Sequence, residues 1–326
     1  MIRRLLLALV ACLAPAVFAH ADTVYFTSKS TGSLFSFNWT STTTGTIVPT
    51  TVRTGLLSPN GMAMGPDGNL YVTETGGNRA GKITRVQPTS GTSSLVVNLP
   101  GTDPAGVTFL PNGGNMIVSS LEPDDSEDGI VLFDVSGWSG NAASATPYTT
   151  FPLSGGSAVA TGPNGEVLVS NNPGYNGNVL GFTSGSATPA TVIVNGIDPS
   201  QTRAPTGLLV DGSTLYSLSI VDNRLLKTDL SAQSPSTATL ASLSANSFPS
   251  ALAMLSNGSL LVGTANYSGQ FFVVDPLTGN YADFFVADAG QVGGIVAVPE
   301  PATLALAAIG LAVIGWDARR RLGRVA

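Results

Sequence analysis

The stretch from Ser58 to Val72 reads Ser-Pro-Asn-Gly-Met-Ala-Met-Gly-Pro-Asp-Gly-Asn-Leu-Tyr-Val. Two short apolar runs, Gly61–Met64 and Leu70–Thr73, flank a turn with the sequence Pro-Asp-Gly-Asn. Asp-Gly and Asn-Gly turns supply the positive φ angles that a tight β-hairpin requires. This stretch therefore predicts an antiparallel hairpin of two short strands.

The same strand–turn–strand pattern occurs five times along the chain. The second strands begin at Leu70, Met116, Val167, Leu215 and Leu260, so successive copies are 45 to 51 residues apart. Further apolar runs, such as 81–86 and 95–97, follow the second strands and supply a third and a fourth strand. A period near 45 residues with four strands in each unit is typical of a β-propeller.

Two half-units without partners lie at the ends of the repeat region, Val24–Thr27 and Gly294–Ala297. We expect the C-terminal strand to become the inner strand of the blade whose other strands come from the N-terminus, because this pairing removes exposed strand edges. The predicted fold is all-β: a six-bladed β-propeller closed by N- and C-terminal strands. An open sandwich of repeats is the alternative.

The N-terminus has the pattern of a secretory signal peptide. Arginines at positions 3 and 4 precede an apolar run from Leu5 to Phe18, and Ala19-His20-Ala21 forms an A-x-A cleavage site. The mature chain is therefore expected to begin at Asp22, which makes 1–21 a signal peptide and the chain an exported protein.

Removal of this peptide limits the chemistry that remains. The only cysteine is Cys12 and the only histidine is His20, and both lie in the peptide. The mature chain would then lack disulfides, thiol nucleophiles, Ser-His-Asp triads and histidine-ligated metals.

The region between the predicted signals is acidic. Residues 22–298 contain 8 Lys and Arg against 18 Asp and Glu, a net charge of −10. Nucleic-acid binding requires clustered positive charge, so this balance argues against a nucleic-acid partner. It favours solubility outside the cell and is compatible with divalent cations.

The C-terminus combines three features in order: Pro299-Glu300-Pro301, an apolar run from Ala302 to Trp316, and the basic residues Arg319, Arg320 and Arg321. The prolines keep the first segment extended, the apolar run can enter a bilayer, and the arginines hold its end in the cytoplasm. The run is shorter than the roughly 20 residues of a full span, which suits a temporary anchor.

This tail resembles the PEP-CTERM sorting signal of Gram-negative bacteria. The resemblance implies domains at 22–298 (propeller) and 299–326 (sorting signal), and processing by an exosortase-type enzyme. It also implies a transient stay in the inner membrane, followed by sorting to the envelope or extracellular matrix. Proteins with this signal are associated with exopolysaccharide and biofilm, so a polysaccharide partner is expected. A plain C-terminal membrane anchor is the alternative.

The quoted stretch around Asn60 also resembles the NHL and gluconolactonase-like six-bladed propellers. In the lactonases a tunnel metal is bound by a Glu, Asn residues and an Asp, and the resemblance places Asn60 among these ligands. The position of the family's Asp in the next blade is occupied by Ala105, with Asp103 two residues away. The alternative role for Asn60 is to cap the turn before its strand.

A second metal-site candidate lies in the acidic loop Glu122–Gly129. Asp124, Ser126 and Asp128, followed by Gly129, match the opening of a calcium loop, in which oxygen side chains on alternate residues converge on a hard cation. The twelfth position, glutamate in an EF-hand, is Val135. The loop predicts either a Ca²⁺ site or a solvated acidic loop.

Asn, Gly and Tyr recur in the corresponding loops of other blades, 76–79, 171–177 and 266–269. Such residues can bind sugars, and they are also ordinary turn residues. We therefore expect this exported propeller to have a binding or structural role and not to be an enzyme. The alternative is a metal-dependent, gluconolactonase-like hydrolase, for which three or more carboxylate or amide oxygens should converge in the tunnel.

Overall fold

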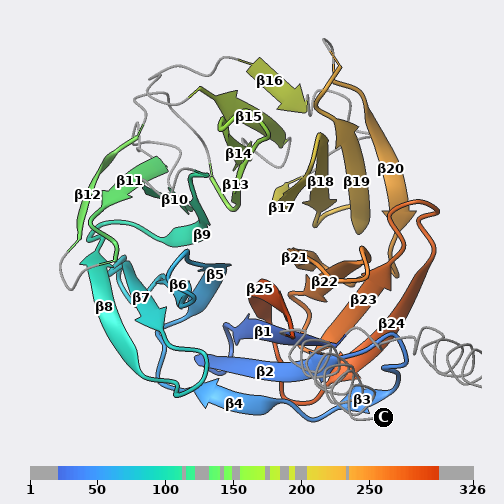
Figure 1. Cartoon of the computed structure of the whole chain (residues 1–326), viewed down its shortest axis with the longest axis horizontal. Helices are drawn as coiled ribbons and strands as arrows, with labels where there is room; N and C mark the ends of the chain where they lie inside the picture. The colour runs from blue at the N-terminus through green and yellow to red at the C-terminus, as the bar shows by residue number, and fades with distance from the viewer. Residues whose placement is uncertain are drawn as a thin grey trace, which may run out of the picture.

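The computed structural model describes residues 21–111, 115–121, 132–139, 143–148, 155–172, 177–183, 191–194, 204–232 and 235–300. Within these ranges every regular element is a β-strand, and the strands form six sheets arranged as a ring (Figure 1). Among these residues no helix is long and apolar enough to cross a membrane. The predicted signal peptide up to position 20 and the apolar tail from position 301 lie outside the described residues.

The six sheets are the blades of a propeller, which confirms the predicted fold. From the central tunnel outward, blade 1 consists of β25 (Val292–Pro299), β1 (Asp22–Ser28), β2 (Ser33–Trp39) and β4 (Thr50–Arg53). Blade 2 consists of β5 (Pro59–Met64), β6 (Leu70–Glu74), β7 (Lys82–Val86) and β8 (Ser93–Asn98). Blade 3 consists of β9 (Pro104–Phe109), β10 (Met116–Ser120), β11 (Leu132–Ser136) and β12 (Ser144–Pro147).

The other three blades continue in chain order around the ring. Blade 4 consists of β13 (Val159–Thr161), β14 (Val167–Asn171), β15 (Asn178–Phe182) and β16 (Thr191–Val194). Blade 5 consists of β17 (Pro205–Asp211), β18 (Thr214–Ser219), β19 (Arg224–Asp229) and β20 (Thr237–Ser242). Blade 6 consists of β21 (Pro249–Met254), β22 (Leu260–Thr264), β23 (Gln270–Val274) and β24 (Tyr281–Val286), with β3 (Thr46–Ile47) added at its outer edge.

The inner hairpins of blades 2 and 6 have the turns that the sequence predicts. In blade 2, Met64 pairs with Leu70, and the Gly65 N–H donates to the Asn69 carbonyl at 2.8 Å. Gly68 in this turn has a φ of +74°, and Gly258 in the equivalent turn of blade 6 has a φ of +85°. These angles lie in the left-handed region that glycine enters without a steric penalty.

The ring is closed by the two ends of the domain, as predicted. β25 pairs antiparallel with β1, with Phe26 opposite Ile295 and Asp22 opposite Pro299. The two strands lie side by side in blade 1 (Figure 1). This pairing gives β1 a partner on both sides, because β2 lies on its other edge.

A second closure, which the sequence did not predict, joins the outer edges of blades 1 and 6. After β2 the chain crosses to blade 6, where β3 pairs in parallel with β24. The Phe285 N–H donates to the Gly45 carbonyl at 3.0 Å, and the Ala287 N–H donates to the Ile47 carbonyl at 2.8 Å. The chain then returns to blade 1 as β4, so blades 1 and 6 are linked at the tunnel and at the rim.

The hydrophobic core is divided into six clusters, one between each pair of neighbouring blades. The cluster between blades 1 and 6 contains Phe26, Phe37, Phe271 and Phe284. The rings of Phe26 and Phe271 meet edge to face at 5.5 Å. Buried aromatic pairs of this geometry are worth about 0.5–1.5 kcal/mol beyond their area. Aromatic packing therefore stabilises the interface where the ring closes.

Candidate functional site

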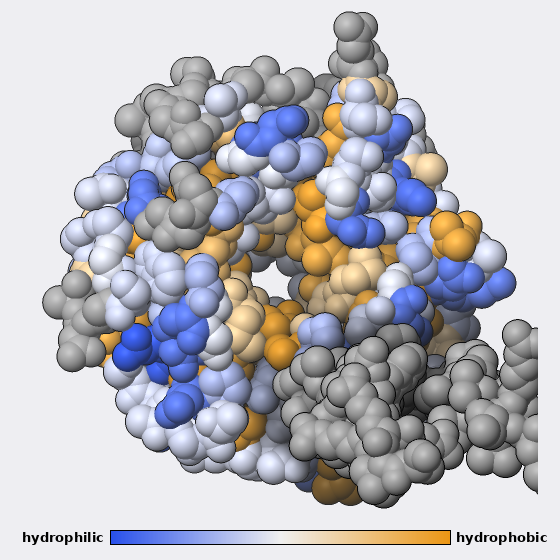
Figure 2. All heavy atoms as spheres, viewed as in Figure 1, coloured by the Kyte–Doolittle hydropathy of each residue, from blue (hydrophilic) through white to orange (hydrophobic). Residues whose placement is uncertain are grey.

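The central tunnel is narrowed by one apolar side chain from the inner strand of each blade. These six residues are Met62, Val107, Val159, Leu208, Leu252 and Ile295. Each follows a glycine or alanine, such as Gly61. A Cβ at Gly61 would lie 2.0 Å from the Ala105 carbonyl oxygen, so this position requires glycine for neighbouring inner strands to approach. Figure 2 shows apolar residues gathered around the central opening.

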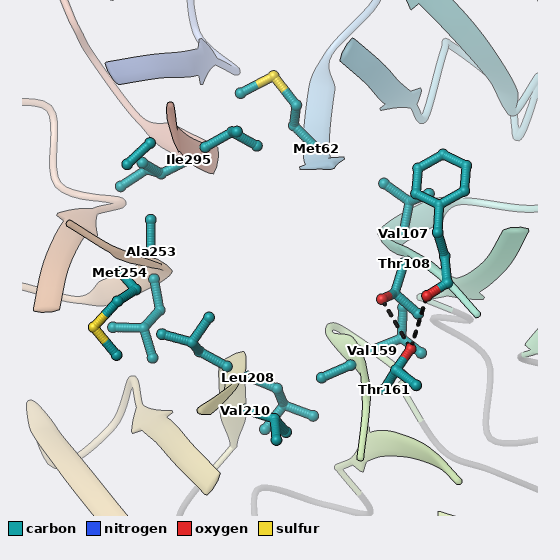
Figure 3. Close-up of a pocket in the computed structure, with 16 residues that line it drawn as sticks. Met62, Val107, Thr108, Val159, Thr161, Leu208, Val210, Ala253, Met254 and Ile295 are labelled. Carbon is teal, nitrogen blue, oxygen red and sulfur yellow. Dashed lines mark hydrogen bonds between the residues drawn. The ribbon is translucent and has the colours of Figure 1, made fainter. Parts of the chain in front are cut away.

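On the side where the inner strands end, the tunnel widens into a vestibule of about 410 Å³. Its lining is apolar apart from Thr108 and Thr161 and includes Leu209, Val210 and Met254. The Thr161 hydroxyl donates to the Phe109 carbonyl at 3.1 Å and lies 3.3 Å from the Thr108 hydroxyl (Figure 3). The hydroxyl groups of Thr108 and Thr161 in the vestibule therefore contact each other and the backbone.

On the side where the inner strands begin, hydroxyl groups bridge neighbouring blades around a smaller cavity of about 90 Å³. Five of them donate to a carbonyl of the next inner strand: Ser157 Oγ to Pro205 O (2.5 Å), Thr206 Oγ1 to Pro249 O (2.7 Å), Ser250 Oγ to Val292 O (2.6 Å), Thr27 Oγ1 to Asn60 O (2.7 Å) and Thr73 Oγ1 to Ala105 O (2.8 Å). A hydroxyl has one proton to donate, so these groups stabilise the ring and retain only lone pairs for a ligand.

Asn60, the predicted tunnel ligand, is the second residue of β5 and is partly buried. Its backbone carbonyl oxygen accepts a hydrogen bond from the Thr27 hydroxyl. Asn60 is not among the described residues that line the two tunnel cavities. The equivalent positions of the other inner strands hold Ala105, Ser157, Thr206, Ser250 and Gly293. These six equivalent positions therefore hold one amide, three hydroxyls and no carboxylate.

Nothing in the described ranges brings three or more His, Cys, Asp or Glu side chains close enough to hold a metal ion. The predicted calcium ligands Asp124, Ser126 and Asp128 lie outside the described residues, as do Ala19, Pro301 and Arg319–Arg321. The calcium site therefore stays a prediction.

Glu74, at the end of β6, is a buried carboxylate that the sequence reasoning did not single out. Its Oε2 accepts a hydrogen bond from the Leu57 N–H and lies 3.3 Å from Lys82 Nζ, while Oε1 accepts from the Thr84 hydroxyl. Both oxygens are satisfied, so Glu74 fixes the entry of the chain into blade 2. The run Leu-Tyr-Val-Thr-Glu shows only that a charged residue, Glu74, ends an apolar strand.

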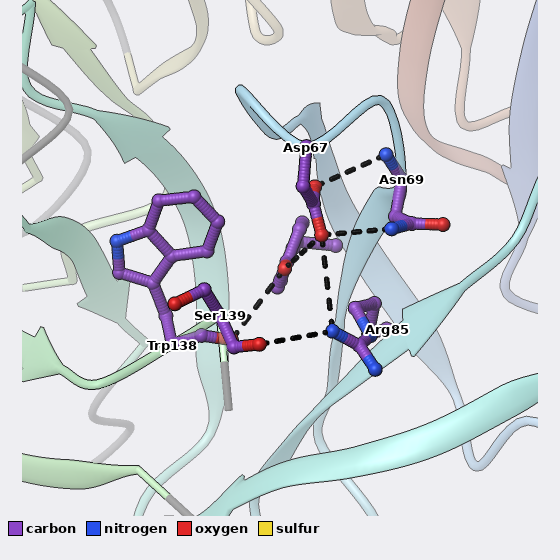
Figure 4. Close-up of polar contacts among 6 residues, drawn as sticks. Asp67, Asn69, Arg85, Trp138 and Ser139 are labelled. Atoms are coloured by element: carbon purple, nitrogen blue, oxygen red, sulfur yellow. Dashed lines mark hydrogen bonds and ion pairs between the residues drawn. The ribbon is translucent and has the colours of Figure 1, made fainter. Parts of the chain in front are cut away.

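A polar cluster joins blades 2 and 3 at the inner turn of blade 2 (Figure 4). Asp67 Oδ2 accepts from the Tyr71 hydroxyl at 3.0 Å and from Asn69 Nδ2 at 2.7 Å, and lies 3.8 Å from Arg85 Nη1. Arg85 Nη1 also donates to the Ser139 carbonyl of blade 3 at 3.3 Å.

The charge and hydrogen bonds of this cluster shift two pKa values. Burial alone would raise the pKa of Asp67, but the hydrogen bonds from Asn69 and Tyr71 and the charge of Arg85 lower it below its ordinary value. Burial and the contact with Asp67 raise the pKa of Tyr71. The T-shaped contact of Tyr71 with Trp138, at 5.5 Å, shows that this cluster is part of the blade interface.

A third cavity, of about 410 Å³, lies at the junction of blades 1, 2 and 3 on the face where the inner strands begin. Its lining includes Lys29, Asn78, Arg79 and Asp103. Lys29 of blade 1 and Arg79 of blade 2 thus line the same cavity, in the loop region that the sequence singles out at 76–79. We name this the basic cavity.

The two chain junctions lie together on the opposite face. β1 begins at Asp22 and β25 ends at Pro299, and these two residues are paired. The Glu300 N–H donates to the Ala21 carbonyl at 3.1 Å. In an antiparallel ladder hydrogen-bonded and non-hydrogen-bonded pairs alternate, so Pro299 occupies a position where its missing N–H costs no ladder bond.

Residues 297–321 match the PEP-CTERM protein-sorting motif. The match begins within β25, so the sorting motif continues directly from the closing strand of the propeller. No match was found among curated proteins.

Solved structures with the same fold are distant in sequence. A nidogen/laminin complex chain matches with a TM-score of 0.66 and 12% identity, covering 85% of this chain and 98% of that chain. TolB from Acinetobacter baumannii matches with a TM-score of 0.63 and 13% identity, over 90% of this chain and 70% of that chain. Virginiamycin B lyase from Staphylococcus aureus matches with a TM-score of 0.53 and 13% identity, over 81% of each chain. These likenesses show the propeller fold.

Proposed function

We propose that this chain is an exported propeller that is processed at both ends and binds an anionic extracellular polysaccharide. The PEP-CTERM sorting motif at 297–321 supports the proposed export, because this motif is typical of exported proteins of Gram-negative bacteria. The motif also implies an exosortase-type processing enzyme. In this proposal the chain is held transiently in the inner membrane and is then sorted to the envelope or extracellular matrix, in keeping with a role in biofilm.

The position of the two junctions supports processing at both ends. The predicted signal-peptide junction at Ala21–Asp22 lies beside Pro299 and Glu300 of the sorting segment in blade 1. Both predicted membrane segments are therefore joined to the propeller on one face, where the inner strands end. The basic cavity lies on the other face and is directed away from the membrane while the chain is tethered.

The tunnel lining supports a binding or structural role over hydrolysis. A lactonase-like mechanism needs several carboxylate or amide oxygens around one metal. At the level of Asn60 the tunnel presents hydroxyls that donate to backbone carbonyls, and its middle is a ring of apolar side chains. These features contribute to closing the ring rather than to holding a reacting group.

The basic cavity supports a sugar-acid ligand. Lys29 can donate charge-assisted hydrogen bonds to a carboxylate, and Arg79 adds a second positive charge to the lining. Asn78 can donate to hydroxyls or accept from them, and Asp103 can accept from them. A volume of about 410 Å³ is sufficient for one or two sugar units of a longer chain. The donor set therefore favours a polyuronate over a neutral glucan.

Equilibrium binding of the protein purified from its host to alginate, with neutral dextran as the comparison, tests this proposal. We expect alginate to bind, and the double change Lys29→Gln with Arg79→Gln to weaken binding about tenfold or more, since each hydrogen bond to a charged group is worth about 1.5–3 kcal/mol. Arg53→Gln, an exposed change on β4 that removes one positive charge outside the cavity, is the control and should leave binding nearly unchanged.

Equal binding by all variants, or no preference for alginate over dextran, would contradict the proposed ligand. Hydrolysis of an aldonic lactone that is lost on Asn60→Ala would support the hydrolase instead.

A further inference from the structure

Asp22, the first residue of β1, has a fully buried carboxylate that joins the two ends of the ring. Its Oδ2 accepts hydrogen bonds from both the N–H and the hydroxyl of Ser256, each at 3.0 Å. Ser256 lies in the inner turn of blade 6, and Asp22 lies in blade 1, so these bonds cross the interface where the ring closes.

The other oxygen of this carboxylate is not satisfied. Asp22 Oδ1 is buried and has no hydrogen-bond partner within the described part of the chain. The ionisable side chains on β1, β2, β25 and the turn at 255–259, together with the residue after β25, are Asp22 itself, Tyr25 and Glu300, and none of them is a cation. A buried carboxylate without a cation is costly, because burial removes it from water without a compensating charge.

We propose that signal-peptide cleavage supplies the missing cation, in the form of the new α-ammonium group of Asp22. This inference rests on the proposed export, because it requires hydrolysis of the Ala21–Asp22 bond. Water adds across that bond: Ala21 leaves with a carboxylate on the signal peptide, and Asp22 retains an α-amine. With an ordinary pKa of about 7.7–8.0, the amine takes up a proton at neutral pH.

Covalent geometry places the new charge beside the old one. The α-nitrogen is joined to the side-chain carboxyl carbon through Cα and Cβ, so the two lie about 3–4 Å apart in any rotamer. An ammonium group also has three protons, so it can keep one in the ladder with β2 while another compensates the carboxylate. Cleavage therefore stabilises the interface between blades 1 and 6.

The same hydrolysis acts on the sorting segment. In the uncleaved chain the Ala21 carbonyl accepts from the Glu300 N–H at 3.1 Å. When Ala21 leaves, Glu300 loses this partner, and the ladder ends at the Asp22–Pro299 pair. One event thus tightens the closure of the propeller and frees the backbone of Glu300 in the Pro-Glu-Pro motif.

The test compares two forms of the chain that differ by one residue, one running from Asp22 to Ala326 and one from Ala21 to Ala326, each released from a removable fusion and kept in detergent. We expect the form that begins at Asp22 to melt about 2–5 °C higher at pH 7. The difference should vanish in the Asp22→Asn background. It should also vanish as pH rises through the pKa of the α-amine, which the neighbouring carboxylate raises, because a cation stabilises only while it is protonated.

Two controls separate the role of Asp22 from other causes. Glu300→Gln removes the other nearby carboxylate and should leave the difference in place. If Asp22→Asn prevents folding, Nα-acetylation of the form that begins at Asp22 removes the charge without changing the side chain, and should lower its melting temperature to that of the Ala21 form.

Equal melting temperatures of the two forms at pH 7, or a difference that persists after the amine is deprotonated or acetylated, would overturn the inference. N-terminal sequencing of the protein exported by the host reports separately on the proposed processing. A start other than Asp22 would contradict that proposal, while the comparison of the two engineered forms would still measure the interaction.

Discussion

Thr27 and Gly294 are 267 positions apart in the chain, and the Gly294 N–H donates to the Thr27 hydroxyl at 2.8 Å. The same hydroxyl donates to the Asn60 carbonyl of blade 2 at 2.7 Å. One buried side chain on β1 therefore connects the closing strand β25 to the inner strand of the next blade. The ring depends on such contacts, because a propeller has no other core than the interfaces between its blades.

Loss of the closing strand should unfold the propeller. Deleting Gly293–Val298 removes most of β25, exposes the edge of β1 and removes Ile295 from the core between blades 1 and 6. We expect aggregation or a melting temperature far below that of the parent chain. A chain that ends at Glu300 is the control, because it retains all of β25. The closure would be refuted if the deletion variant had the same melting temperature as the parent chain.

Thr27→Val should destabilise the fold without changing the volume of the side chain. The substitution leaves the Asn60 carbonyl and the Gly294 N–H without their buried partner. Each unsatisfied group costs about 1–3 kcal/mol, so we expect a loss of about 2–4 kcal/mol in the free energy of unfolding by denaturant. Thr23→Val on the same strand is the control, since the Thr23 hydroxyl makes a longer contact of 3.4 Å with Asn38 near the surface. Equal effects of the two substitutions would contradict the role of Thr27.

The architecture could be read from the sequence because it repeats. Five turns of the Asn-Gly or Asp-Gly kind at a regular spacing fix the hairpins, and the two half-units fix the closure of β25 on β1. The clasp by β3 could not be predicted, because Thr46–Ile47 is too short to carry a pattern and its partner on β24 lies in another blade. Long-range register of this kind is set by packing rather than by local sequence.

The sites were harder to predict than the fold. The sequence shows that Ser157, Thr206 and Ser250 recur at one position, but not that their hydroxyls bond to the next blade. The burial of Asp22 and Glu74 was likewise not visible, because a carboxylate next to an apolar strand is usually exposed. The basic cavity combines Lys29 with Arg79 from another blade, and only the three-dimensional fold brings these residues together.

The contribution of Asp67 to stability should depend on pH. The pKa of its carboxyl is lower in the folded state than its ordinary value, so its ionised form stabilises the fold above about pH 4. This contribution is lost as pH falls through the lowered folded pKa. We expect Asp67→Asn to reduce the free energy of unfolding at pH 7 and to have less effect at pH 3. Tyr71→Phe removes one of the hydrogen bonds to Asp67 and should reduce the pH-dependent part. A difference between the parent chain and Asp67→Asn that is the same at both pH values would contradict this assignment.

Calcium should stabilise the propeller if the acidic loop is a metal site. Five negative charges between Glu122 and Asp128 repel one another without a cation. A ligand at a hundredfold excess over its Kd stabilises the folded form by about 2.7 kcal/mol. We expect millimolar Ca²⁺ to raise the melting temperature, and Asp124→Asn with Asp128→Asn to abolish the rise. Asp229→Asn with Asp275→Asn, in exposed turns elsewhere, is the charge-matched control. An unchanged melting temperature of the parent chain in Ca²⁺ would show that the site does not exist.

Intact-mass spectrometry of the protein recovered from its final location in the native host tests the proposed processing at both ends of the chain. We expect a chain that begins at Asp22 and has lost everything after the Pro-Glu-Pro region. We also expect that changing Pro299, Glu300 and Pro301 to alanine leaves the uncleaved chain in the inner membrane. A mass that includes the C-terminus at Ala326, measured on protein from outside the inner membrane, would show that the tail is a plain anchor and is not a sorting signal.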